Sequence, residues 1–446
     1  MLTVSPLLTD LYQLTMMQGY MDQSMREVGV FEFFVRKMPN NRNFLMAAGL
    51  EQVINFLENI RFAREDLDYL KKDGRFRSKF LDFLADFRFT GEVHAMPEGT
   101  IFFPDEPILR IMAPIAQAQL VETRVINLLQ FQTMVASKAA RITLTAPDKL
   151  LVDFGLRRAH GAEAGLLAAR ASYLAGFTGT STVLAGRMYG IPVFGTMAHS
   201  FIQAHDSECE AFEHFARSQP DNVVLLIDTY DTEKAAEKLF HLAEKLAREH
   251  IKIKAVRLDS GDMTKHSKKV RLILDQGGLE GVHIFTSGNL DEYKIAEFAA
   301  GNAPIDGFGV GTKMVTSADS PYLDCAYKLV EYAGTARRKC SEGKATWPGR
   351  KQVYRYYDGQ GVMNGDVLTL ESDPLDGKPL LRPVASEGKR YPGLPTLHEC
   401  RRHALAGLAG LSADMRGLQS GYMYPVKISR ALQELTLEIE KKVSAP

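Results

Sequence analysis

The chain has 446 residues, of which 45% are hydrophobic and 24% charged, a composition typical of a globular protein with about two or three structural units. Its 54 Lys and Arg residues balance its 54 Asp and Glu residues, so the net charge gives no indication of a nucleic-acid partner. The N-terminus has no signal pattern, and no apolar run is long enough to cross a bilayer, so we expect a cytoplasmic protein with no membrane partner.

The N-terminal part of the chain mixes helical and strand patterns. Residues 49–60, 64–89 and 117–140 carry apolar residues at helical spacing, whereas residues 91–113 form short apolar runs broken by prolines. We therefore predict an α+β domain over residues 1–140.

From about residue 149, apolar runs of strand length alternate with helical stretches. Continuous apolarity favours parallel strands that are covered on both faces, with helices as crossovers. The sequence predicts a β/α barrel, complete or partial, over residues 141–339, with its chemistry at the carboxyl ends of the strands. The expected strands are KLLVDFG (149–155), IPVFGTM (191–197), NVVLLID (222–228), IKAVRLD (253–259), VHIFTSG (282–288) and IDGFGVGT (305–312).

Residues 340–446 are polar and rich in turns, and they end in an amphipathic helix within 411–443. We expect this segment to pack on the N-terminal domain. Its HECRRH stretch brings His398, Cys400 and His403 close in sequence, but a fourth ligand is missing and we predict no metal site there. The four cysteines are scattered along the sequence without paired spacing, which indicates reduced thiols; they are Cys209, Cys325, Cys340 and Cys400.

Three strand ends carry candidate binding residues. GFGVGTKMVTS (307–317) has glycines that suit a phosphate cradle, although a plain turn would use them too. VRLDSGD places Arg257 and Asp259 on the same side of a strand, where they would bind an anion and ribose or Mg²⁺, or form a surface ion pair. DFGLRRAHG offers Phe154 for stacking beside Arg157, unless the ring belongs to the core.

His199 follows the strand pattern of residues 191–197, with Thr196 and Ser200 nearby. A lone histidine is commonly structural. Here the next apolar run ends in Asp228, whose carboxylate would orient one ring nitrogen and leave the other free to attack phosphorus. His199 is thus a candidate nucleophile.

Taken together, these stretches resemble the nicotinate phosphoribosyltransferase family of type II phosphoribosyltransferases. The resemblance spans most of the chain up to about residue 355, and it implies an incomplete or irregular β/α barrel with an α+β domain. The matching motifs are TDLYQLTM, FEFFVRKMP, DFGLRRAHG, GFTGTSTV, GTMAHSF, VRLDSGD, TSGNLDE, GFGVGT and CSEGKATWPGRKQVYR.

The resemblance implies transfer of phosphoribose from 5-phosphoribosyl 1-pyrophosphate to nicotinate, with Mg²⁺ and coupled hydrolysis of ATP. It implies that His199 is transiently phosphorylated with Asp228 as its partner, and that Tyr12 reaches the site from the second subunit of a homodimer. The other implied contacts are Phe154 with the pyridine ring; Arg157, Thr196 and Arg257 with substrate anions; Asp259 with ribose or metal; Ser287 and Gly288 with the ribose phosphate region; and Gly309, Gly311 and Thr312 with the 5-phosphate.

Ser181 in GFTGTSTV favours nicotinate, because the nicotinamide enzyme carries an aspartate at the matching place, and an aspartate would repel a carboxylate. The alternatives are a nicotinamide-preferring relative and a catalytically silent metabolite-binding protein. A barrel aldolase would need a lysine at a strand end, and none of the six runs ends in one.

Overall fold

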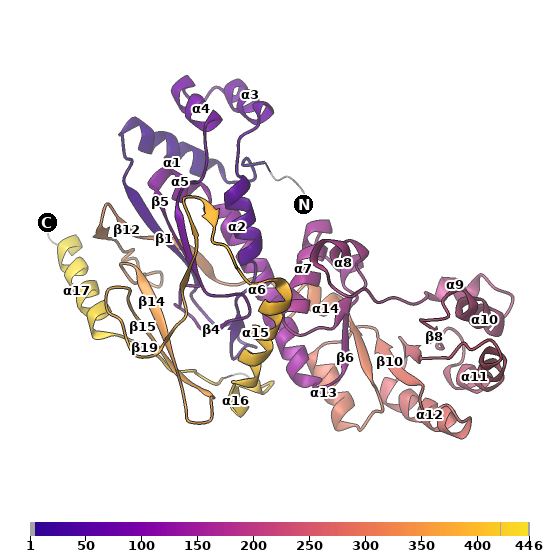
Figure 1. The fold of residues 1–446 in the computed structure, drawn as a ribbon. Helices are drawn as coiled ribbons and strands as arrows, with labels where there is room; N and C mark the ends of the chain where they lie inside the picture. Colours follow the sequence, from indigo (N-terminus) through magenta and orange to yellow (C-terminus); the bar gives the residue numbers. More distant parts are fainter. Residues whose placement is uncertain (1–4, 420, 445–446) are drawn as a thin grey trace. The chain divides into compact units, whose positions relative to one another are not determined.

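The computed structural model describes residues 5–419 and 421–444. Its chain divides into two compact units, each with its own core (Figure 1). Unit 1 holds the described residues up to Ser137 and from Tyr322 onward, and unit 2 holds Lys138–Pro321. The division falls within helix α6 (Glu122–Thr145).

Unit 1 is built on a seven-stranded antiparallel sheet in the order β13-β12-β1-β5-β3-β17-β18. Strand β1 has the apolar sequence VGVFEFFV and is buried along almost its whole length, as a central strand must be. The strands are β1 (Val28–Val35), β3 (Glu92–Ala95), β5 (Leu109–Pro114), β12 (Cys325–Tyr332), β13 (Thr335–Ala336), β17 (Arg382–Ser386) and β18 (Lys389–Arg390).

Two smaller sheets complete unit 1, with the orders β16-β14-β15-β19 and β2-β4. Their strands are β2 (Leu45–Met46), β4 (Ile101–Phe102), β14 (Lys351–Tyr357), β15 (Met363–Leu370), β16 (Lys378–Pro379) and β19 (Val426–Ile428). The helices are α1 (Leu11–Asp22), α2 (Leu50–Asn59), α3 (Arg64–Asp73), α4 (Ser78–Ala85), α5 (Ile115–Leu120), α15 (Leu397–Ala409), α16 (Ala413–Arg416) and α17 (Arg430–Ser444).

The compact barrel unit of the structure ends at Pro321, before the boundary predicted at residue 339. Strand β12 pairs antiparallel with β1, from Val35 opposite Cys325 to Gly29 opposite Tyr332. This pairing places the chain from Tyr322 onward in unit 1. The C-terminal segment joins the same sheet through β17, which lies beside β3.

Unit 2 contains a six-stranded parallel sheet in the order β7-β6-β11-β10-β9-β8, an incomplete β/α barrel. The expected strand at 191–197 is reduced to a single parallel bridge between Thr180 and Val193, since Pro192 has no N–H to donate to a ladder. The strands are β6 (Leu150–Asp153), β7 (Gly179–Thr180), β8 (Val224–Leu226), β9 (Ala255–Leu258), β10 (His283–Ser287) and β11 (Gly307–Val310).

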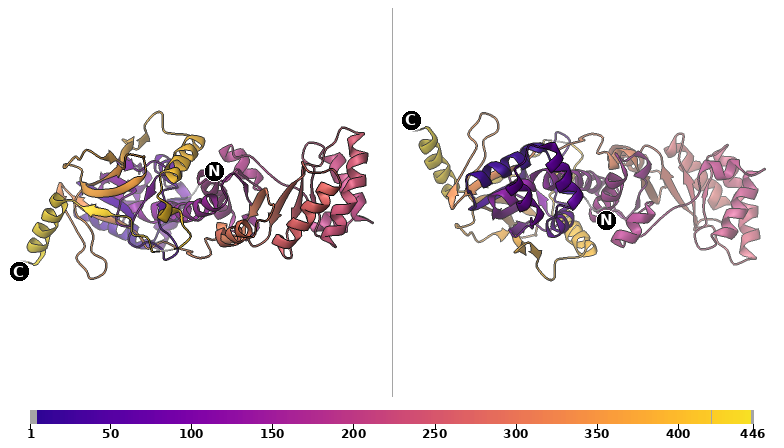
Figure 2. Two further views of the ribbon diagram at one scale, coloured as in Figure 1. Left: turned by 90° about the horizontal axis from the view of Figure 1, so that it is seen from below. Right: turned by 90° about the horizontal axis from the view of Figure 1, so that it is seen from above.

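Helices connect the barrel strands, and α10, α11 and α12 lie side by side (Figure 2). Several begin with a side-chain cap; Asp231, Asp262 and Asp291, for example, accept a hydrogen bond from the backbone N–H three residues later. Within the described residues, no helix combines the length and apolarity needed to span a membrane. The helices are α7 (Ala162–Leu174), α8 (Val183–Tyr189), α9 (His199–Gln203), α10 (Glu208–Ser218), α11 (Thr232–Ala247), α12 (Met263–Gln276), α13 (Glu292–Ala300) and α14 (Thr312–Val315), with a 3-10 turn at Leu156–Arg158.

Candidate active site

His199 is the first residue of helix α9, and its ring lies against the ends of β8 and β9. Its Nδ1 is 3.1 Å from Thr229 Oγ1, and its Nε2 is 3.7 Å from Asp259 Oδ2. The side chain is 38% exposed. The imidazole therefore has one nitrogen in a hydrogen bond and the other in the field of a carboxylate, accessible to a ligand.

Asp228 does not contact His199 in the way the sequence suggested. Its Oδ2 accepts hydrogen bonds from the Asp259 N–H at 2.8 Å and the Ser260 hydroxyl at 2.6 Å, so the carboxylate is held by the turn after β9. Thr229, the next residue, takes the expected place beside the imidazole. The other oxygen of Asp228, Oδ1, is buried without a hydrogen-bond partner among the described residues.

Asp259 is fixed from the neighbouring strand. The Ser287 hydroxyl, at the end of β10, donates to Asp259 Oδ1 at 2.7 Å. Gly288 has a φ of +94°, and a Cβ there would lie 2.3 Å from the Asp259 carbonyl oxygen. Ser287 and Gly288 thus position Asp259, which leaves its Oδ2 facing His199.

Arg257 precedes this group on β9 and points to the same opening. Its Nη1 donates to the Thr196 hydroxyl at 3.2 Å, and its Nε is buried without a partner in the described chain. Burial lowers the pKa of Arg257, with the Asp259 and Asp228 carboxylates opposing that shift and Arg157 adding to it. A guanidinium with unused donors, next to a second arginine, is suited to bind an anion.

Phe154 explains two glycines of the GFGVGT stretch. A Cβ on Gly309 would lie 2.5 Å from the Phe154 ring, and one on Gly311 would lie 2.8 Å from its carbonyl oxygen. The ring is half-buried and 5.9 Å from the ring of Phe285. Packing therefore requires these glycines, and phosphate binding by the turn, including Thr312, stays a prediction.

Ser181 is anchored at the end of β7. Its N–H donates to the Asp153 carbonyl at 2.8 Å, while the buried Asp153 carboxylate accepts from the Thr180 hydroxyl and the Gly155 N–H, both at 2.7 Å. Burial raises the pKa of Asp153 to about 6. This carboxylate ties the ends of β6 and β7 together and so sets where the half-buried Ser181 stands.

Two other sequence candidates lie in unit 1. Tyr12, on α1, is 49% exposed, and its contribution to a partner's site stays a prediction. In the HECRRH stretch, His403 Nε2 is 3.0 Å from the Thr100 hydroxyl. Among the described residues no group of three or more His, Cys, Asp or Glu side chains is arranged to hold a metal, and all four cysteines are free thiols.

Family models match most of the chain. The nicotinate phosphoribosyltransferase N-terminal domain matches residues 7–130, the nicotinate phosphoribosyltransferase family matches 150–341, and the C-terminal domain of the same enzyme matches 373–436. The chain belongs to the nicotinate phosphoribosyltransferase family. The resemblance inferred from its motifs is thereby confirmed.

Relatives in the nicotinate phosphoribosyltransferase family are similar over nearly the full length. Nicotinate phosphoribosyltransferase pncB2 of Mycobacterium tuberculosis is 50% identical over 96% of this chain and 92% of its own. The Bacillus subtilis enzyme is 38% identical over 84% of this chain and 78% of its own. The crystal structure of human nicotinic acid phosphoribosyltransferase, 30% identical, matches with a TM-score of 0.87 over 97% of this chain and 100% of the human chain, which confirms the predicted fold class.

Proposed function

We propose that this chain is a nicotinate phosphoribosyltransferase, which forms nicotinate mononucleotide and pyrophosphate from nicotinate and 5-phosphoribosyl 1-pyrophosphate in NAD salvage. Full-length membership of the family carries this conclusion. The set of His199, Arg257 and Asp259 at one edge of the barrel sheet agrees with it, because a silent binding protein would need no such set.

The chemistry makes modest demands on the protein. Departure of pyrophosphate leaves oxocarbenium-like charge on the ribose, and the pyridine nitrogen attacks without help from a base. The site therefore has to hold the two reactants in line and neutralise the leaving group. Arg257, whose Nε has no partner in the described chain, supplies a positive charge for that purpose.

Recognition of nicotinate rests on a ring, a cation and a hydroxyl. The half-buried Phe154 offers a flat face for the pyridine, and the exposed Arg157 offers a guanidinium for an anionic group. Ser181 can donate a hydrogen bond to the nicotinate carboxylate, which an aspartate at this place would repel. These three residues favour nicotinate over nicotinamide.

ATP coupling would proceed through His199. With Nδ1 held by Thr229, Nε2 is the nitrogen available to attack the γ-phosphorus of ATP. A P–N bond forms as the bond to the bridging oxygen breaks and ADP leaves, and water later hydrolyses the phosphohistidine to phosphate. The added charge would alter substrate affinity only through a difference in binding between the two states.

Asp228 and Asp259 are the residues that would hold a Mg²⁺, since Asp228 Oδ1 is buried without a protein partner in the described chain and this ion prefers carboxylate oxygens. Bound there, the ion would neutralise phosphate charge.

The exposed ring of Tyr12 is consistent with a homodimer that shares its sites. Free thiols, two of them exposed, are consistent with a reducing cytoplasm.

Incubation of the protein with nicotinate, 5-phosphoribosyl 1-pyrophosphate and Mg²⁺, with and without ATP, tests this proposal. We expect nicotinate mononucleotide, formed faster with ATP, and preference for nicotinate when nicotinamide competes. Preference for nicotinamide would support the alternative substrate. Absence of both mononucleotides would show a silent binding protein.

A further inference from the structure

Unit 1 contains a cavity of about 580 Å³ that none of the barrel's strand-end residues lines. Its walls come from α2, the loop before β4, strands β14, β16 and β17, and helix α15. Residues from these six elements line one space, and its volume is that of a small-molecule site.

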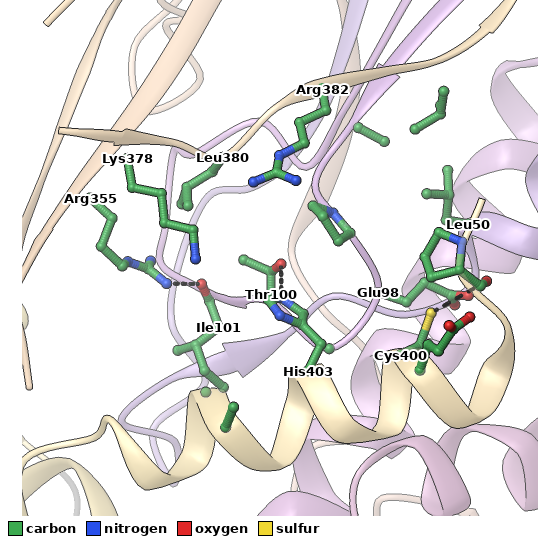
Figure 3. A pocket seen from close by; sticks show the side chains of 18 of the residues that line it. Leu50, Glu98, Thr100, Ile101, Arg355, Lys378, Leu380, Arg382, Cys400 and His403 are labelled. Atoms are coloured by element: carbon green, nitrogen blue, oxygen red, sulfur yellow. Dashed lines mark hydrogen bonds between the residues drawn. The ribbon is translucent and has the colours of Figure 1, made fainter. Parts of the chain in front are cut away.

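Positive charge gathers on one side of this cavity. Figure 3 shows Arg355, Lys378 and Arg382 on one side, and Leu50, Glu98 and Cys400 on the other. Arg355 is already satisfied, because its guanidinium pairs with Asp366 and donates to the Ile101 carbonyl at 2.8 Å. In the part of the chain that the structure describes, Lys378 and Arg382 are exposed and have no carboxylate within ion-pair distance, and the Lys378 ammonium lies 5.9 Å from the centroid of the Tyr357 ring. Both cations remain available to a ligand.

The carboxylates of the lining are engaged elsewhere. Glu98 Oε1 accepts a hydrogen bond from the Gly49 N–H at 2.6 Å, and Glu51 pairs with Arg390 at 2.9 Å. Glu399 caps the start of α15, where it accepts from the Thr396 N–H and hydroxyl, both at 2.8 Å. None of them neutralises the two available cations.

We propose that this cavity binds a small phosphate monoester, with the phosphate between Lys378 and Arg382 and an apolar group against Leu50 and Ile54. Two unpaired positive charges match a phosphate dianion, and the lysine ammonium and arginine guanidinium both donate hydrogen bonds to its oxygens. Apolar lining residues supply the remaining contact area for an organic group.

The pKa of His403 depends on the positive charge at this cavity. Burial lowers its pKa, and the nearby positive charges of Lys378, Arg382 and Arg355 lower it further. Its Nε2 contacts the Thr100 hydroxyl, and the ring lines the cavity. A bound dianion would offset the three cations, so the pKa of His403 should rise when the site fills.

Isothermal titration of phenyl phosphate into the full-length protein tests the proposal. We expect saturable binding that the double variant Lys378→Gln/Arg382→Gln weakens at least about tenfold. The matched control Lys72→Gln/Lys389→Gln removes two exposed lysines outside the cavity and should bind as the unaltered protein does. NMR titration, with the His403 signal assigned from His403→Gln, should show its pKa rising with ligand.

Four results would overturn the proposal. They are absence of binding at millimolar concentration, equal affinity in the double variant when circular dichroism shows it folded, loss of binding in Arg257→Gln instead, and no change at His403. Inorganic phosphate and benzoate separate the ligand classes. If either binds as tightly as phenyl phosphate, the site does not select a phosphate monoester.

Discussion

Two charged clusters, one in each unit, show how differently the same residue types are used. In unit 1, Glu32 and Arg110 are fully buried, and the Lys351 ammonium lies 2.7 Å from the Glu32 carboxylate. At the barrel edge, Arg257 is half-buried and donates a hydrogen bond to a neutral hydroxyl, that of Thr196. The first cluster is closed to solvent and its charges are paired, whereas the guanidinium of the second is only half-buried and has no charged partner within ion-pair distance in the described chain.

The difference separates structural from functional charge. Lys351 also donates to the carbonyls of Trp347 and Gly349, so water and ligands have no place in its surroundings. Arg110 Nε in this cluster, like Asp228 Oδ1 and Arg257 Nε at the barrel edge, is buried without a hydrogen-bond partner in the described chain, which costs stability. Arg110 is fully buried, whereas the side chains of Asp228 and Arg257 are half-buried and within reach of a ligand. Unsatisfied polar atoms on half-buried side chains at strand ends therefore indicate the site better than fully buried charge does.

The largest expected effect is at the barrel edge. His199→Ala should abolish stimulation by ATP while slow ATP-independent transfer persists, because the alanine cannot accept phosphate. Initial rates with and without ATP measure this. The matched control His241→Ala removes a fully exposed imidazole of the same unit and should keep the stimulation; ATP coupling that survives in His199→Ala would contradict the role given to this histidine.

Next in size is the closed cluster of unit 1. Glu32→Gln should lower the free energy of unfolding by about 3 to 5 kcal/mol, because it leaves the Lys351 ammonium buried without its carboxylate, while Arg110 keeps its pair with Glu371. Urea unfolding measures the loss. Glu434→Gln, which breaks an exposed pair with Arg430, is the control and should cost less than about 1 kcal/mol; similar losses in both variants would erase the contrast between closed and exposed charge.

Asp153→Asn should show an effect that depends on pH. The folded-state pKa of Asp153, about 6, lies above its ordinary value of 3.8, so its contribution to stability is present below pH 3.8 and is lost as pH rises through 6. Asparagine does not ionise. The free energy of unfolding of the variant, relative to that of the original protein, should therefore be higher above pH 6 than below pH 3.8, by at most about 3 kcal/mol. Unfolding curves at pH 4 and pH 7.5 that differ by a constant amount would rule this out.

The smallest expected effect concerns substrate choice. Ser181→Asp should raise the KM for nicotinate about tenfold or more through charge repulsion, with little change in stability. Ser181→Ala, which removes only the hydroxyl, is the control and should have a smaller effect. The KM values for nicotinate and nicotinamide are measured for both variants. An unchanged preference in Ser181→Asp would show that the nicotinate carboxylate does not bind beside residue 181.

Sequence patterns predicted the barrel well, because continuous apolar runs mark parallel strands directly. Five of the six expected runs contain β6, β8, β9, β10 and β11. The sixth run, residues 191–197, forms only the single bridge at Val193, next to Pro192. The two-residue strand β7 was not predicted, because it is too short to show a pattern. β12 was not predicted as a strand of unit 1, since its pairing with β1 joins residues about 300 apart in sequence.

The sequence also placed His199, Arg257 and Asp259 at one opening, but not their hydrogen bonds. Successive residues at a strand end point in opposite directions, so Thr229 rather than Asp228 meets the imidazole. Which of two neighbours faces the ring depends on the exact turn after β8. The one signal in the sequence for the role of Thr229 is that its hydroxyl directly follows the carboxylate of Asp228 at the end of the expected strand.

The barrel has a seam. Ladders of hydrogen bonds join the strands in the order β7-β6-β11-β10-β9-β8. Residues 191–197 are attached by fewer contacts: the bridge between Thr180 and Val193, a hydrogen bond from the Asn222 amide to the Gly195 carbonyl, and one from Arg257 to the Thr196 hydroxyl. His199 follows directly on this stretch. A phosphoryl charge placed on the imidazole would therefore act on a stretch that few backbone hydrogen bonds hold to the sheet, where a displacement of the chain breaks few of them.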